Sequence, residues 1–272
     1  MNKKILSAPY LLWSVVFIII PLLMVFYYGL TDKSGAFTLE NILAIATVEH
    51  SKALWLAIKL SIESTIICLI LAYPLSMILS KLNVNQHSFI VFIFILPMWM
   101  NFLLRTLAWQ TLLEKTGVIN SILKTLGLPG INIINTSGAI ILGMVYNFLP
   151  FMIIQIYTSL TKMDYSLIEA AKDLGASPRK CFTKVTLPLS MPGVISGITL
   201  VFLPSVSSFC IPRMLGGGSY VMVGTIIESQ FLTAGDWNFG SAISLIMAVI
   251  IMISMYITKK VDKGEKMEAN NA

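Results

Sequence analysis

Six long apolar runs dominate this sequence. They lie near 9–30, 54–80, 88–112, 137–161, 190–211 and 240–258. A helix needs about 20 consecutive apolar residues to cross the hydrocarbon core of a bilayer. Only 12% of the 272 residues are charged and 56% are hydrophobic, whereas a soluble domain carries roughly 25% charged residues. The pattern excludes a water-soluble domain and predicts an all-α membrane protein with six transmembrane helices.

The first run is expected to stay in the mature protein. It extends from Ala8 to Leu30, which is longer than the apolar core of about 7–15 residues in a secretory signal, and no A-x-A cleavage site follows it. Five of the runs contain proline: Pro21, Pro74, Pro97, Pro150 and Pro204. Neighbouring helices can satisfy the backbone groups that proline frees, so these runs are still predicted to be helices, with kinks allowed.

The positions of lysine and arginine predict the orientation in the membrane. With six spans, both termini and the second and fourth loops share one side. That side holds twelve basic residues: Lys3, Lys4, Lys81, Lys162, Lys172, Arg179, Lys180, Lys184, Lys259, Lys260, Lys263 and Lys266. The other side holds five: Lys33, Lys52, Lys115, Lys124 and Arg213. The positive-inside rule therefore predicts a multi-pass plasma membrane protein with both termini cytoplasmic.

Several chemistries are not expected. The net charge of +6 resides in short loops and gives no sign of nucleic-acid binding. The three cysteines, Cys68, Cys181 and Cys210, lack metal-ligand spacing and are expected to be packing residues. Gly216-Gly217-Gly218 is not followed by the Lys-Ser or Lys-Thr of a phosphate-binding loop. We therefore expect no enzyme active site, no metal and no cofactor, and any ATP must be hydrolysed by another subunit.

The fourth loop contains residues that favour the starts and ends of short helices. Asp164 is placed to cap a short helix, and Gly175 to end it in a left-handed conformation. Ser177 is placed to cap a second short helix, with Pro178 at its favoured first position. Pro188 is expected to limit that second helix before the next span. The loop thus predicts two short helices on the cytoplasmic face.

The first of these helices carries an apolar stripe at helical spacing, formed by Leu167, Ile168, Ala171 and Leu174. Periodicity leaves two interpretations open. The segment is either an interfacial helix lying on the bundle with a solvated face or a docking helix for a cytoplasmic partner.

The string Glu169-Ala170-Ala171-x-x-x-Gly175, followed by Leu187-Pro188, resembles the EAA loop of ABC importer permeases. The resemblance implies the type I ABC importer permease fold and a loop, 162–188, that inserts into a groove of the ATPase. The coupling residues that it implies are Glu169, Ala170, Ala171, Gly175 and Pro188.

A resemblance to spermidine/putrescine permeases of the PotB type extends over most of the chain. It rests on Leu96-Pro-Met-Trp-Met-Asn101, Pro188-Leu-Ser-Met-Pro-Gly193, Phe202-Leu-Pro204, Ile211-Pro-Arg-Met-Leu-Gly216 and Asp236-Trp-Asn-Phe-Gly240. One departure stands at Arg213, where that family often has an acid. Neighbouring subfamilies for iron, sulfate or other small solutes share much of the pattern.

This resemblance implies a permease subunit that translocates polyamines. It divides the chain into a first helix with an external loop at 1–52, a permease core at 53–260 and a cytoplasmic tail at 261–272. The implied partners are an ABC ATPase dimer, a second permease subunit of the PotC type, an external polyamine-binding protein and the lipid bilayer. The alternatives are a permease for iron or sulfate, a non-transport membrane scaffold, and a secondary transporter, although no internal repeat supports the last.

A second group of residues is placed to line the path or to contact a cation outside the membrane. Its members are Glu63, Trp99, Asn101, Glu228, Asp236 and Trp237. A structural role is the competing interpretation for each. Lys59 and Glu63 are four residues apart and can pair on one helix face, and Arg105 requires a structural partner because intramembrane charge is costly. Glu228 and Asp236 can be solvated loop charges, and the tryptophans fit an interfacial belt.

Overall fold

The computed structural model describes residues 3–81, 94 and 96–271, and helices make up most of that part of the chain. No strand occurs among these residues; a single isolated bridge joins Thr31 to Phe37. The all-α prediction is therefore confirmed for the described part.

Within the described residues, five helical stretches are long and apolar enough to cross a membrane: Pro9–Gly29, Glu49–Leu79, Ser137–Thr161, Pro178–Val206 and Trp237–Lys260. They coincide with five of the six expected runs. They are built from α1 (Lys3–Ser14), a π-helical segment (Val15–Ile19), α2 (Ile20–Gly29), α4 (Val48–Leu79), α8 (Ser137–Thr161), α10 (Pro178–Cys181), a second π-helical segment (Phe182–Thr186), α11 (Leu187–Val206) and α14 (Trp237–Asn271).

The expected span at 88–112 lies partly outside the described residues. Its described part is not one continuous helix. A 3₁₀ turn at Leu96–Trp99 is followed by α6 (Phe102–Leu113). The side chain of Asn101 accepts the N–H groups of Leu103 (2.8 Å) and Leu104 (3.3 Å) and so starts a new helix after the break.

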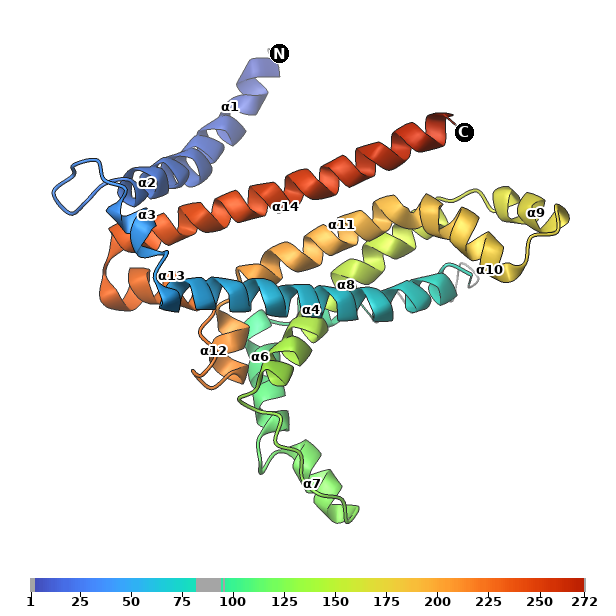
Figure 1. Ribbon diagram of the computed structural model, residues 1–272, viewed down its shortest axis with the longest axis horizontal. Coiled ribbons are helices and arrows are strands. Elements are labelled where there is room, and N and C mark those ends of the chain that lie inside the picture. The colour runs from blue at the N-terminus through green and yellow to red at the C-terminus, as the bar shows by residue number, and fades with distance from the viewer. Residues whose placement is uncertain (1–2, 82–93, 95, 272) are drawn as a thin grey trace.

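The long helices α4, α11 and α14 run roughly along the longest dimension of the molecule, and α8 is more steeply inclined to it (Figure 1). The core lies where α8 packs against α4 and α11, and its fully buried side chains include Leu60, Met144, Met152, Ile156 and Val201. The N-terminal helix contacts the bundle through α2, which packs against α14. None of the most apolar stretch of 18 residues in that first helix is buried within the chain, so this surface is open to lipid or to another subunit.

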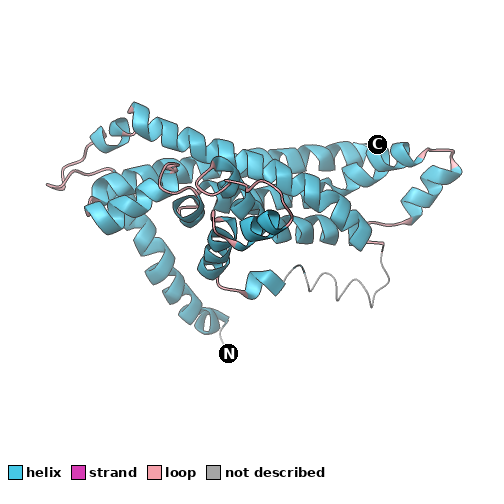
Figure 2. Cartoon of the chain, turned by 90° about the horizontal axis from the view of Figure 1, so that it is seen from below, coloured by secondary structure: helices cyan, strands magenta, loops and turns pink. Residues whose placement is uncertain are grey.

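The two ends of the bundle differ. At one end lie α9 (Ser166–Asp173), α10 and the C-terminal ends of α4 and α14, and Figure 1 shows α9 standing beyond the long helices. The opposite end carries α3 (Glu40–Ala44), α12 (Cys210–Leu215), α13 (Val223–Ser229) and a π-helical turn at Gln230–Ala234. A hairpin containing α7 (Val118–Thr125) projects away from the bundle beyond α6. The view from below shows the same separation of the ends (Figure 2).

Candidate functional site: the loop between α8 and α11

Asp164, which the sequence predicts as the cap of this helix, lies two residues before α9, and Tyr165 occupies the cap position. The Asp164 carboxylate accepts the N–H of Ser166 (2.9 Å), in the first turn of the helix. That hydrogen bond lowers the pKa of the Asp164 carboxyl below its usual value. Negative charge at this position also complements the partial positive charge of the helix N-terminus.

The end of α9 confirms the prediction made for Gly175. Its φ is +79°, a left-handed conformation that costs glycine little. The Gly175 N–H donates to the carbonyl of Lys172 (2.8 Å) and the Ala176 N–H to that of Ala171 (3.0 Å). This pair of bonds is a Schellman motif, which satisfies the last carbonyls of the helix. The chain therefore turns sharply at a fixed point.

The start of α10 is also as predicted, but its end is not. Ser177 accepts the N–H of Lys180 (3.4 Å) and Pro178 occupies the first turn. Pro188 does not limit this helix, because α10 continues through the π-helical segment into α11. The Leu187 N–H bonds to the Phe182 carbonyl, five residues back. This wider turn accommodates Pro188 within a continuous helix. The segment expected to be a short second helix is therefore the beginning of the next span.

The first two residues of the Glu169-Ala170-Ala171 motif lie on the exposed face of α9. Glu169 and Ala170 are exposed, and Ala171 is half-buried. Within the apolar stripe, Ile168 is buried against the chain whereas Leu174 is 89% exposed. A helix that lay flat on the bundle would bury more of its stripe. Most of the apolar stripe is therefore free of contacts within the chain, and both the docking and the interfacial interpretations stay open.

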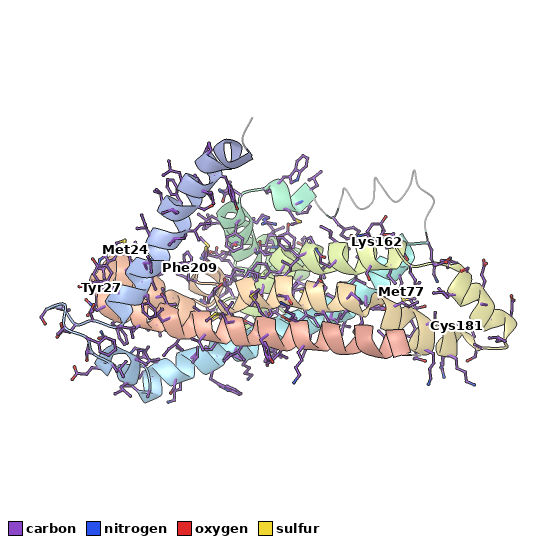
Figure 3. All side chains as sticks on the ribbon, turned by 90° about the horizontal axis from the view of Figure 1, so that it is seen from above. Met24, Tyr27, Met77, Lys162, Cys181 and Phe209 are labelled. Atoms are coloured by element: carbon purple, nitrogen blue, oxygen red, sulfur yellow. The ribbon has the colours of Figure 1, made fainter. Side chains whose placement is uncertain are left out.

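A cavity of about 500 Å³ separates α9 from the ends of the long helices. Met77 at the end of α4 and Cys181 at the end of α10 both line it. Figure 3 places these two residues, together with Lys162, at the end of the molecule that carries α9. The sequence pattern gave no sign of this cavity, because its walls come from four separate segments.

The residues proposed for the path inside the membrane are dispersed. Glu63 lies 3.9 Å from Lys59 on α4, which confirms the expected contact. Trp99 is 76% exposed, and Asn101 serves as the cap of α6. Arg105 is buried, with its Nε and Nη1 atoms free of hydrogen bonds to the described residues. No hydrogen bond within the described residues therefore satisfies these two atoms, and the structural partner expected for Arg105 stays a prediction.

The charged residues of the fifth loop are paired. Glu228 binds Arg213, so the arginine that departs from the family pattern neutralises a nearby acid. Asp236 accepts the N–H of Phe239 (3.0 Å) and lies 3.3 Å from Lys33 Nζ. The Phe239 hydrogen bond, followed by the Lys33 interactions, lowers the pKa of the Asp236 carboxyl. The neighbouring Trp237 is 51% exposed.

These six residues therefore fall into three groups, on α4, just before α6 and from α13 to the start of α14, and no salt bridge joins one group to another within the described chain. Sequence reasoning also missed Asn238, whose amide donates to the carbonyl oxygens of Thr31 (2.7 Å) and Tyr28 (3.1 Å). That contact joins the loop after α2 to the start of α14 across more than 200 residues, and no local pattern marks it.

The sequence of this chain is similar to those of known transport proteins. Residues 3–266 match the family described as "Binding-protein-dependent transport system inner membrane component". The chain is 35% identical over 269 residues to the spermidine/putrescine transport system permease protein PotB of Haemophilus influenzae, covering 96% of this chain and 94% of that protein.

Solved structures of bacterial ABC transporters share the fold. A transporter involved in the import of the acidic polysaccharide alginate aligns with a TM-score of 0.79 at 16% identity, covering 95% of both chains. The alginate transporter in complex with its alginate-bound periplasmic protein aligns with a TM-score of 0.78 at 16% identity, covering 94% of this chain and 91% of that one.

Proposed function

This chain belongs to the family of inner membrane components of binding-protein-dependent transport systems, and we propose that it moves polyamines as a permease subunit of an ABC importer. The substrate assignment rests on 35% identity over nearly the whole length to a spermidine/putrescine permease. The permease carries the solute and does not itself catalyse a reaction. In the proposed assembly the ATP is hydrolysed by a separate subunit.

The coupling element of this proposal is α9 with its flanking turns, residues 162–188. The single observation that carries it is the exposure of Glu169 and Ala170 on a short helix that stands beyond the end of the bundle. Capping at Asp164 and the Schellman turn at Gly175 hold that helix rigidly. A rigid helix can transmit the movement of an ATPase groove to α8 and α11, which it joins. ATP then biases the permease toward one of two states by binding that state more tightly.

The proposed assembly has four kinds of subunit. An ABC ATPase dimer binds α9, and a second permease subunit of the PotC type completes the path. An external polyamine-binding protein delivers the solute to the end that carries α12 and α13. A periplasmic protein bound to the structurally similar alginate transporter supports that arrangement.

The proposed topology has six spans, with the third at 88–112, and both termini in the cytoplasm. The basic residues support it, because Lys81 and Lys162 follow the ends of two candidate spans at the α9 end, and Lys259 and Lys260 are the last residues of a third. The permease core is then 53–260, preceded by a first helix and external loop at 1–52 and followed by a tail at 261–272.

A second candidate is a permease for another small solute, such as sulfate or iron. The pairing of Arg213 with Glu228 favours an anion such as sulfate, because it removes one free carboxylate from the proposed external end, where a polyamine would first meet the permease. For a cation, the proposed contacts remain Glu63, Trp99, Asn101, Asp236 and Trp237, and the carboxylates of Glu63 and Asp236 also contact Lys59 and Lys33.

The test is uptake of labelled spermidine and putrescine by cells that lack their own polyamine importers. The cells express this chain with its ATPase, second permease and binding protein. Glu169→Ala is expected to abolish ATP-dependent uptake, and the matched control Asp173→Ala, an exposed acid on the same helix, is expected to retain it. An assembled complex that takes up sulfate or iron and neither polyamine would contradict the substrate assignment.

A further inference from the structure

The cavity beneath α9 has the composition of a site for an amphiphile. Its floor is apolar and includes Met77, Leu160 and Ile168, while Lys81, Lys172 and Tyr165 supply polar groups. Lys81 follows α4, Leu160 lies in the last turn of α8, and the other two polar residues belong to the α9 segment. At about 500 Å³ the cavity falls within the range of small-ligand pockets, about 300–1,000 Å³.

The charge of the cavity has one sign. Among its described lining residues both charged side chains are lysines, and none is an aspartate or glutamate. Neither lysine forms a salt bridge within the described chain. The acids of α9, Glu169 and Asp173, are exposed and do not line the cavity. Two ammonium groups over an apolar floor select a ligand that combines a negative charge with hydrocarbon.

The depth of the cavity identifies the source of such a ligand. Two candidate spans end at Leu79 and Thr161, so Lys81 and the cavity lie at the level of the lipid headgroups. Basic pockets between helices at the cytoplasmic side bind anionic headgroups. We propose that this cavity holds the phosphate of an anionic phospholipid between Lys81 and Lys172, with the first acyl carbons over Met77 and Leu160.

The site has a consequence for coupling. A headgroup held between Lys81 and Lys172 joins the end of α4 to α9. The lipid thereby sets the angle at which the proposed docking helix stands on the bundle. The inference rests on the proposed membrane insertion and orientation, and not on the identity of the solute.

Native mass spectrometry of the complete transporter, extracted from nanodiscs that contain dioleoyl phosphatidylglycerol, tests the proposal. The wild-type complex is expected to retain the lipid, and Lys81→Gln/Lys172→Gln to lose about fivefold in retention for each lysine removed. Lys180→Gln/Lys184→Gln is the matched control, because both lysines are exposed at the same end but do not line the cavity. Lys81→Arg/Lys172→Arg keeps the charge and is expected to keep the lipid.

Three outcomes overturn the proposal. One is equal retention by the wild type and Lys81→Gln/Lys172→Gln. Another is equal loss in the control pair, which would show an unspecific effect of surface charge. The third is thermal stabilisation of lipid-free wild type by inorganic phosphate with no phosphatidylglycerol retained, which would assign the site to a soluble anion. If Lys81→Gln/Lys172→Gln does not assemble, Ile168→Trp, which fills the cavity without changing charge, must lose the lipid. Because this experiment measures lipid retention and not transport, loss of the lipid proposal would not affect the polyamine assignment. Loss of the polyamine assignment would likewise not affect the lipid proposal.

Discussion

At the scale of single residues, the tight packing of α11 on α8 depends on Gly193. A Cβ atom there would lie 2.7 Å from the Gln155 carbonyl oxygen and would clash with the Ser159 side chain. A helix backbone cannot give way as the end of a side chain can. At Gly197 the situation differs, because an added Cβ atom would lie nearest to Sδ of the flexible Met152 side chain. The packing of α11 on α8 therefore needs glycine at 193 more than at 197.

We expect Gly193→Ala to lower the free energy of unfolding by about 1–3 kcal/mol, the usual cost of overpacking. Gly138→Ala, near the start of α8, is the control, because its Cβ would meet nothing closer than 3.5 Å. Thermal unfolding of the purified complex compares the two. Equal midpoints for both variants would contradict this account of the α8–α11 contact.

The lowered pKa of the Asp236 carboxyl predicts that the stability of the fold depends on pH. Its pKa is lowered in the folded chain, so the carboxylate stabilises the fold above the unfolded value of 3.8. This contribution is lost as pH falls through the lower folded pKa, since the protonated acid holds Phe239 and Lys33 less strongly. The thermal midpoint of the wild type should exceed that of Asp236→Asn at pH 6, and the difference should shrink below about pH 4. A difference that stays constant down to pH 3 would rule the linkage out.

At the scale of elements, the π-helical segment at Phe182–Thr186 sets the direction of α9 and α10. A π-turn holds one extra residue in an otherwise α-helical run. Removing that residue would rotate α10, and α9 with it, by about 100° about the helix axis relative to α11. The exposed face of α9 would then point away from its present direction.

Deletion of Thr183, an exposed residue of this segment, is expected to abolish co-purification of the ATPase with the tagged chain. Thr183→Ala is the matched control, because it removes the same hydroxyl, which donates to the Arg179 carbonyl, and keeps the chain length. The ATPase should stay bound to this control. Retention of the ATPase by the deletion variant would show that the register of α10 does not orient α9.

Local chemistry explains which elements the sequence could predict. The cap at Ser177 and the turn at Gly175 depend on residues within five positions, and both were predicted correctly. The role of Pro188 was predicted wrongly, because proline suggests an end to a helix and nothing local indicates a π-turn that accommodates it. Contacts such as that between Asn238 and Thr31 depend on the tertiary fold and leave no periodic signal.

At the scale of the whole molecule, the two ends of the bundle are expected to face opposite sides of the membrane. The twelve-to-five distribution of basic residues predicts which end is cytoplasmic. The native cysteines Cys68, Cys181 and Cys210 are buried, so a new cysteine at the surface can be labelled against a low background.

A membrane-impermeant maleimide is expected to label Leu128→Cys in intact cells, because Leu128 is 51% exposed on the hairpin beyond α7. Leu174→Cys, at a residue 89% exposed beside α9, should be labelled only after the cells are permeabilised. Unmutated chain serves as the control. Labelling of position 174 in intact cells would reverse the proposed topology.

The coupling of this permease to a separate ATPase through α9 is tested most directly by the rate of ATP hydrolysis. This rate is measured for the reconstituted complex before and after addition of spermidine-loaded binding protein. We expect the loaded protein to raise the rate for the wild type and for Asp173→Ala, and we expect Glu169→Lys to remove the response while the complex stays assembled. An undiminished response in an assembled Glu169→Lys complex would contradict the claim.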